Sequence, residues 1–279
     1  MAIRFLIDSA SDLLPAEAAS LGVTCIPMQI TFGAETYEDG VTLSHKDFYT
    51  KLGASSTLPV TSQINPAVYG AYFEELTANG DEVVAITLSS GLSGTTQSAR
   101  IAAADFEGKV FVVDSLNATI GQRILLLRGL TLAKEGLSAA QVAEKLEVEK
   151  QKIRLVAIID TLEYLKKGGR ISAATAIAGA ALGIKPAIAV VDGKIANVGK
   201  ARGRQTITLM KQLIEDAGQI DWEKPSAFVF SYADAALRQF IEATPELWEG
   251  HPLPPAYSLG CTIGTHIGPN AYGFAFFEK

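Results

Sequence analysis

The sequence predicts an α/β fold in two domains, with a parallel sheet in the N-terminal half and a mixed sheet in the C-terminal half. Apolar, strand-like runs alternate with amphipathic, helix-like runs through the first half, which is typical of a parallel sheet covered by helices. In the second half, Asp192-Gly193 separates two apolar runs and favours a hairpin. The chain has 279 residues, of which 48% are hydrophobic, so it can bury one large core or two ordinary ones.

The first half is expected to alternate between strands and helices. The strands are residues 3–7, 23–31, 82–88 and 110–113, and the helices are residues 66–78, 117–135 and 139–151. Asn65 is suited to cap the first of these helices, Pro66 to its first turn, and Ser138 to capping the last. The two helices after residue 117 lead into a new set of elements. We therefore divide the chain into an N-terminal domain, 1–150, and a C-terminal domain, 151–279.

The C-terminal half is expected to begin with a strand at 155–159 and to end with a strand at 272–277. Between them lie expected hairpin strands at 185–191 and 194–199, helices at 202–217 and 234–244, and a strand at 226–231. The uncharged segment 171–183 is predicted to be a buried helix. It is shorter than the roughly 20 residues that a membrane span requires.

The composition argues against several classes of function. The net charge is -6 and no long basic stretch occurs, so neither a nucleic acid nor an anionic membrane surface is an expected partner. The apolar run 3–7 is too short for a signal peptide. Cys25 and Cys261 lack disulfide or zinc spacing, and the segment from Asp8 to Asp12 fits a turn before Pro15. We expect a reduced, cytoplasmic protein without a metal site or an integral membrane segment.

Hydroxyl groups and glycines gather between residues 89 and 96, where a buried strand ends and a helix begins. Unpaired N–H groups at a helix start attract anions, and this segment holds more hydroxyls than one N-cap needs. It lacks the lysine of a P-loop and the three glycines of a dinucleotide-binding turn. Thr95 stands where a nucleophile elbow has its closing glycine, which weakens a hydrolase interpretation without excluding it. The segment is predicted to bind an anionic ligand without transforming it.

A second hydroxyl group occurs at Thr61-Ser62-Gln63, just before a predicted helix. Taken alone, it is more typical of a local turn than of a site. Loops that follow the strands of a parallel sheet gather at one edge, where ligands bind. The two hydroxyl segments are therefore expected to hold a carboxylate together.

Three cationic or titratable side chains lie in unusual settings. Arg170 and Arg202 fall near predicted helix starts, where positive charge opposes the helix dipole. An anionic partner and solvated surface arginines explain this equally well. His266 lies beside Thr265 in a predicted loop, 264–271, that is rich in glycine. A site role and a structural role are both open for it.

These motifs, taken in order, resemble the DegV family across the whole chain. They are DSASDL at 8–13, TSQ at 61–63, SSGLSGTTQS at 89–98, LEYLKKGGRI at 162–171 and GTHIGPNA at 264–271. The resemblance implies a DegV-like fold that binds a fatty acid, without a cofactor, in a buried tunnel between its two domains. In better understood bacterial members, a separate ATP-dependent fatty acid kinase subunit phosphorylates the bound carboxylate to an acyl phosphate. An acyltransferase in phospholipid metabolism is a further candidate partner.

The resemblance also implies roles for particular residues. Thr61 and Ser93 would hydrogen-bond the carboxylate. The head group and the transferred phosphate would lie near Ser62, Gly94, Thr95, Arg170, Arg202, Thr265 and His266. Thr96 stands where the family commonly has tyrosine, Ile64-Asn65 where it has proline-serine, and Asn270 where it has glycine.

Two further alternatives stay open at this point. The small-residue segment 172–182 is suited either to lining the tunnel or to tight helix packing. The rival function is a serine esterase or thioesterase that uses Ser93, His266 and either Asp160 or Asp114.

Overall fold

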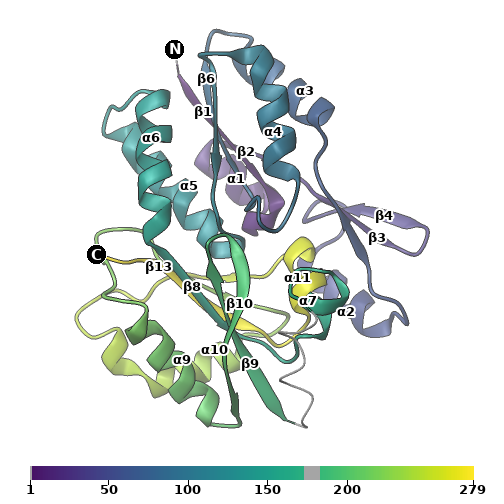
Figure 1. The fold of residues 1–279 in the computed structure, drawn as a ribbon, viewed down its shortest axis with the longest axis vertical. Coiled ribbons are helices and arrows are strands. Elements are labelled where there is room, and N and C mark those ends of the chain that lie inside the picture. Colours follow the sequence, from purple (N-terminus) through teal and green to yellow (C-terminus); the bar gives the residue numbers. More distant parts are fainter. Residues whose placement is uncertain (1, 173–182) are drawn as a thin grey trace.

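A computed structural model describes residues 2–172 and 183–279 of the chain. The helix predicted at 171–183, and with it the proposed lining role of 172–182, lies almost wholly outside these described residues. Figure 1 shows the N-terminal domain in its upper half and the C-terminal domain in its lower half. Within the described part of the chain, no helix is long and apolar enough to cross a membrane.

The N-terminal domain is built on a parallel sheet with the strand order β2-β1-β6-β7. Its strands are β1 (Ile3–Asp8), β2 (Val23–Ile26), β6 (Glu82–Thr87) and β7 (Val110–Asp114). Its helices are α1 (Pro15–Leu21), α3 (Pro66–Thr77), α4 (Thr95–Ala103), α5 (Thr119–Lys134) and α6 (Ala139–Glu149), with short 3-10 turns at Ser9–Ser11, Ala104–Phe106 and Lys150–Lys152. The predicted parallel sheet is confirmed.

Helices cover both faces of this sheet, because successive residues of a strand point to opposite sides. On β1, Phe5 and Ile7 pack with α5 and α6, whereas Leu6 packs with α3 and α4. Both faces are therefore dry. The carboxyl end of β6 points toward the C-terminal domain (Figure 1).

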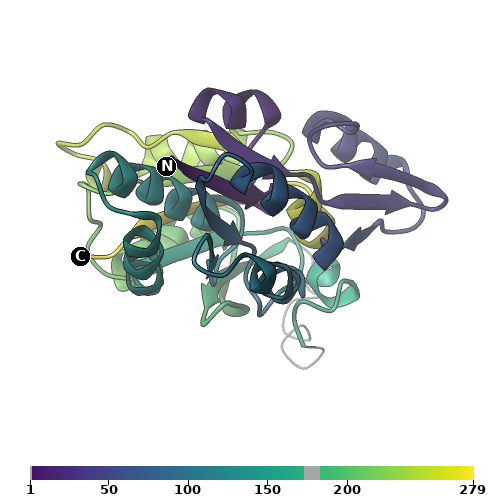
Figure 2. The same ribbon diagram turned by 90° about the horizontal axis from the view of Figure 1, so that it is seen from above.

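The single strand predicted at 23–31 is wrong. The chain forms β2 and then β3 (Gln29–Phe32), which belongs to a separate antiparallel sheet with β4 (Glu35–Glu38) and β5 (Val60–Ser62). Pro27 lies between the two strands and has no N–H group to donate to a ladder, so the first sheet ends there. This small sheet and α2 (His45–Ala54) project to one side of the molecule in both views (Figures 1 and 2). Thr61 is thus on a strand rather than in a loop.

The C-terminal domain contains a mixed sheet with the strand order β10-β9-β8-β13-β11-β12. Its strands are β8 (Ile153–Ile158), β9 (Ile184–Val191), β10 (Lys194–Arg202), β11 (Ala227–Phe230), β12 (Ala256–Ser258) and β13 (Tyr272–Phe277). Its helices are α7 (Glu163–Lys167), α9 (Gln205–Asp216), α10 (Ala235–Ala243) and α11 (Cys261–Ile267), with a 3-10 turn at Pro245–Leu247. The predicted hairpin is confirmed, since Asp192 and Gly193 have φ angles of 47° and 75°.

The two faces of the mixed sheet have different partners. One face packs against α9 and α10, and the other packs against α5 of the N-terminal domain, so a single apolar cluster runs through both domains. The two domains therefore share a core. The exact division at residue 150 stays a prediction.

Two predicted boundaries in the C-terminal half are wrong. Residues 264–267 of the loop expected at 264–271 are instead the last residues of α11, and Gly268, where φ is 76°, caps the end of this helix. Asn270 adopts a φ of 62°, a left-handed conformation that asparagine tolerates in place of glycine. The helix expected at 202–217 begins at Gln205, and Arg202 is instead the last residue of β10.

Candidate functional site

A cavity of about 220 Å³ lies where the carboxyl edge of the parallel sheet meets the C-terminal domain. Its walls come from the loop after β6, from β5, and from α7, α11 and β10. Of the residues singled out from the sequence, six line it: Thr61, Ser62, Ser93, Gly94, Arg170 and His266. The polar groups of several distant segments thus converge on one chamber, which we name the head compartment.

A second, apolar cavity of about 50 Å³ adjoins the head compartment. The two share the wall residues Ala118, Ile195, Ile263 and Ile267. The second cavity extends beneath the mixed sheet, where Ala157 of β8 contributes to its lining. We name it the tail compartment. The two cavities together offer a polar end and an apolar end to one ligand.

Some hydroxyl groups of the segment after β6 stabilise the turn, whereas that of Ser93 faces the cavity. Ser89 Oγ donates to the Gly193 carbonyl at the hairpin tip over 2.7 Å, and Thr96 Oγ1 donates to the Leu88 carbonyl over 2.8 Å. Those two hydroxyls fix the shape of the turn. Ser93 Oγ lies 2.9 Å from Thr95 Oγ1, and only Ser93 of this pair lines the cavity. Thr95 is buried behind it, where it can orient the Ser93 hydroxyl.

A close approach explains one glycine of this segment. A Cβ atom placed on Gly94 would lie 2.1 Å from Gln63 Oε1. Any larger residue would displace the Gln63 side chain, which lines the same cavity. Gly94 therefore lets the TSQ strand and the serine turn meet.

His266 lies in the last turn of α11 and joins the two domains. Its Nε2 is 3.0 Å from Thr61 Oγ1, and its Nδ1 is buried without a partner among the described residues. A Cβ atom on Gly168 would lie 2.2 Å from that Nδ1, so the double glycine after α7 leaves room for the imidazole. Burial and, second, the charge of Arg170 lower the pKa of His266 to about 4. The imidazole is neutral at physiological pH.

We predict a pH effect from this burial. Folding lowers the pKa of His266 from 6.5 to about 4. Between pH 4 and pH 6.5 the imidazole is therefore protonated in the unfolded chain but not in the folded chain. The His266 contribution to stability is thus complete above pH 6.5 and is lost as the pH falls toward 4. NMR titration of the imidazole is expected to give a pKa well below 6.5, the ordinary value for histidine. A pKa of 6.5 or higher for His266 would contradict the prediction.

Arg170 supplies positive charge to the head compartment. Its Nε donates to the Leu92 carbonyl over 3.2 Å and its Nη1 donates to the Gly168 carbonyl. Among residues 2–172 and 183–279, no carboxylate forms an ion pair with it. Its charge is therefore available to an anionic ligand.

Besides Thr95, two of the predicted head-group residues are not among those that line the head compartment. Thr265 is buried, and its Oγ1 donates to the Cys261 carbonyl over 2.9 Å within α11. Arg202 is exposed at the end of β10, with its guanidinium near Gly183. A role for either residue in contact with a ligand remains a proposal.

The described residues do not assemble a serine hydrolase triad. His266 Nε2 pairs with Thr61, and Ser93 Oγ pairs with Thr95. Asp160 bonds Lys185 Nζ and Asn270 Nδ2, each over 2.7 Å. Asp114 accepts the backbone N–H groups after β6 and β7. In the described part of the chain, neither candidate acid is hydrogen-bonded to the imidazole, which needs such a partner in a triad.

Sequence reasoning missed most of the wall that α11 provides. Thr262, Ile263 and Ile267 line the head compartment beside His266. Their positions are consistent with one helix surface, because residues three and four apart lie side by side. This spacing was the available signal, but it is informative only once the segment is known to be helical.

Comparisons with known proteins give a consistent result over the whole chain. A family model described as "Uncharacterised protein, DegV family" matches residues 2–279. The chain is 38% identical over 279 residues to a DegV domain-containing protein of Deinococcus radiodurans, covering 99% of this chain and 98% of that one. A solved structure described as "Fatty Acid Binding of a DegV family Protein from Thermus thermophilus" is similar at 30% identity and a TM-score of 0.88, with 100% of both chains covered. DegV of Bacillus subtilis, described as a fatty acid binding protein, is similar at 30% identity and a TM-score of 0.84, again with 100% of both covered.

Proposed function

Because this chain belongs to the DegV family, we propose that it binds a long-chain fatty acid, with the carboxylate at the polar groups of the head compartment and the acyl chain extending from there into the tail compartment. The observation that carries the proposal is the adjoining pair of cavities. One end offers hydroxyls, an imidazole and a guanidinium, and the other end is apolar. The relatives from Thermus thermophilus and Bacillus subtilis, each described as binding fatty acids, support the same ligand class.

Such a ligand needs apolar surroundings for its tail and hydrogen-bond donors for its head group. Burying a tail of about 15 methylenes at ~0.8 kcal/mol each gives a gross gain on the order of 12 kcal/mol before the costs of association. Moving a carboxylate out of water costs several kcal/mol of free energy unless hydrogen-bond donors of the protein replace its hydration. Thr61 and Ser93 offer two hydroxyl donors, and Arg170 offers charge. The tail would supply affinity and the head would supply orientation.

We further propose that the chain is a non-catalytic subunit that presents the carboxylate to a separate ATP-dependent kinase in the cytoplasm. This finer role rests on the family resemblance. A neutral His266 and the unneutralised charge of Arg170 suit a head group that gains negative charge as an acyl phosphate forms. Arg202, at the exposed end of β10, is the candidate contact for the transferred phosphate. An acyltransferase would then consume the acyl phosphate.

Native lipid content tests the ligand class. Mass spectrometry of freshly purified, denatured protein is expected to show a co-purified long-chain fatty acid. Lipid-free protein that also fails to bind palmitate in calorimetry would overturn the proposal.

A second readout tests the finer role with the same preparation. Lipid-loaded protein, a purified bacterial fatty acid kinase subunit and ATP are expected to yield an acyl phosphate, whereas protein and ATP without the kinase subunit yield none. Labelling of Ser93 by a fluorophosphonate would instead favour the esterase.

A further inference from the structure

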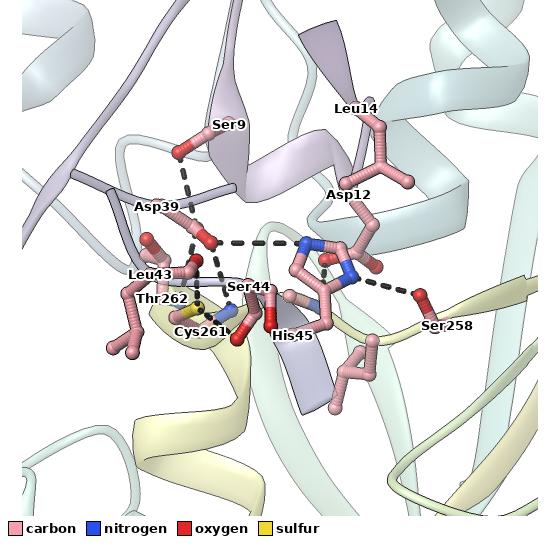
Figure 3. A network of polar contacts seen from close by, with 12 residues as sticks. Ser9, Asp12, Leu14, Asp39, Leu43, Ser44, His45, Ser258, Cys261 and Thr262 are labelled. Carbon is pink, nitrogen blue, oxygen red and sulfur yellow. Dashed lines mark hydrogen bonds and ion pairs between the residues drawn. The ribbon is translucent and has the colours of Figure 1, made fainter. Parts of the chain in front are cut away.

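The start of α11 is held by carboxylates of the N-terminal domain. Asp39, which follows β4, accepts the Cys261 N–H at Oδ1 over 2.9 Å and the Thr262 N–H at Oδ2 over 3.0 Å. Asp12 accepts the Gly260 N–H over 2.8 Å. Figure 3 shows these groups converging on the helix start. Two acidic residues distant in the sequence thus satisfy the first N–H groups of a helix that forms a wall of the head compartment.

Burying these carboxylates costs free energy, which favourable interactions in the folded protein must offset. Asp12 is 2% exposed and Asp39 is 3% exposed. Burial raises the pKa of Asp12 to about 7, which reflects the cost of a charge in this setting. The positive end of the α11 dipole and the N–H donors offset part of that cost. A Cβ atom on Gly260 would lie 3.0 Å from Asp12 Oδ1, so the helix start is pressed closely onto the acidic pair.

Asp39 also reaches a second wall of the head compartment. Ser9 Oγ donates to Asp39 Oδ2 over 3.1 Å and accepts the Met28 N–H over 2.9 Å. Met28 belongs to the N-terminal domain and lines the same cavity as Ile263 and His266 of α11. One carboxylate is therefore bonded to α11 of the C-terminal domain and, through one hydroxyl, to the chain segment that carries Met28.

An ordinary helix cap would hold a helix end and nothing more. Asp39 instead connects two pocket walls that different domains contribute, and α11 carries the imidazole that bonds Thr61. We propose that Asp39 is a positioning residue that sets the place of His266 in the head compartment, an inference that rests on the proposed fatty acid binding. Asp39 acts through α11, while Thr61, Ser93 and Arg170 face the ligand.

The test compares Asp39→Asn with a matched control, Asp81→Asn. Asp81 is also buried, at 7% exposure, and accepts the Ala2 N–H over 2.8 Å. It lies just before the first residue of β6, whereas the cavity lies beyond the last residue of that strand. Asparagine has the same shape as aspartate, but its NH₂ group replaces one carboxylate oxygen. It would therefore face one of the groups that donate a hydrogen bond to Asp39. We expect Asp39→Asn to raise the palmitate Kd roughly tenfold, as loss of a hydrogen bond to a buried charge would. Asp81→Asn should leave the Kd unchanged.

The ¹⁵N signals of the His266 imidazole give a readout that altered stability alone would not move. In Asp39→Asn these signals should shift toward those of Thr61→Val, in which the bond from His266 to Thr61 is absent. Ser9→Ala is the milder variant if Asp39→Asn fails to fold, and it should shift the same signals in the same direction. Unmoved imidazole signals in a folded variant, or equal effects of Asp39→Asn and Asp81→Asn, would overturn the positioning role. Because the NMR readout needs no lipid, it stands even where wild-type protein fails to bind palmitate and the proposed function itself fails.

Discussion

Replacing Thr61 with valine and Ser93 with alanine together is expected to weaken palmitate binding at least 150-fold. Each hydroxyl would donate to the carboxylate, and a hydrogen bond to a charged group contributes about 1.5–3 kcal/mol. Loss of two such bonds costs about 3 kcal/mol at the lower end, or roughly 150-fold in Kd. Both side chains line the head compartment from different segments, so no single neighbour replaces them. Calorimetry on delipidated protein measures the effect.

The control removes two hydroxyls of the same kinds from the surface. Ser20 Oγ donates to the Glu17 carbonyl and Thr131 Oγ1 donates to the Leu127 carbonyl, both at exposed positions. Ser20→Ala with Thr131→Val should bind palmitate as the wild type does. An unchanged Kd in the Thr61 and Ser93 double variant would contradict the assignment of the carboxylate seat.

Filling the tail compartment is expected to shorten the fatty acid that the protein accepts. Ala157 of β8 lines this cavity, and leucine there adds three carbons to a space of about 50 Å³. Displacing about three methylenes of the ligand costs about 2.4 kcal/mol, or roughly 60-fold in the Kd for palmitate. Dodecanoate has a shorter tail, so its Kd should change much less. Comparing the two acids in the same variant measures the effect.

Ala187→Leu is the matched control for this change. Ala187 is fully buried on neighbouring β9, but it belongs to the cluster that packs against α9 and α10 on the other face of the sheet. Overpacking that core costs roughly 1–3 kcal/mol of stability without touching the cavity. It should alter palmitate and dodecanoate binding equally. A variant at Ala157 that weakens both acids to the same degree would contradict a tail compartment at this place.

The elements that sequence predicted well are those whose signals are local. The alternation of apolar strands and amphipathic helices predicted the parallel sheet, and Asp192-Gly193 predicted the hairpin. The failure at 23–31 is different in kind. Pro27 is a local signal for the end of a strand, yet the departure of β3 into another sheet depends on its pairing with β5, about thirty residues later.

The site shows the same division. Ser93 and Thr61 lie in short hydroxyl segments that are visible in the sequence, and both line the cavity. The helix that carries His266 was missed, because its first N–H groups bond Asp12 and Asp39, 248 and 222 residues away. No window of neighbouring residues contains that stabilisation. The family resemblance implied a buried tunnel, but the residues that line the tail compartment were not predicted, since strands of the mixed sheet that are distant in sequence supply them.

The junction between the two cavities has a consequence for how such a protein can diversify. Among residues 2–172 and 183–279, the two linings have four residues in common, Ala118, Ile195, Ile263 and Ile267. Substitutions elsewhere on the mixed sheet can lengthen, shorten or bend the apolar chamber while the polar chamber keeps its chemistry. Ligand preference and head-group handling can therefore drift separately among gene copies, and an engineer can retune one without rebuilding the other.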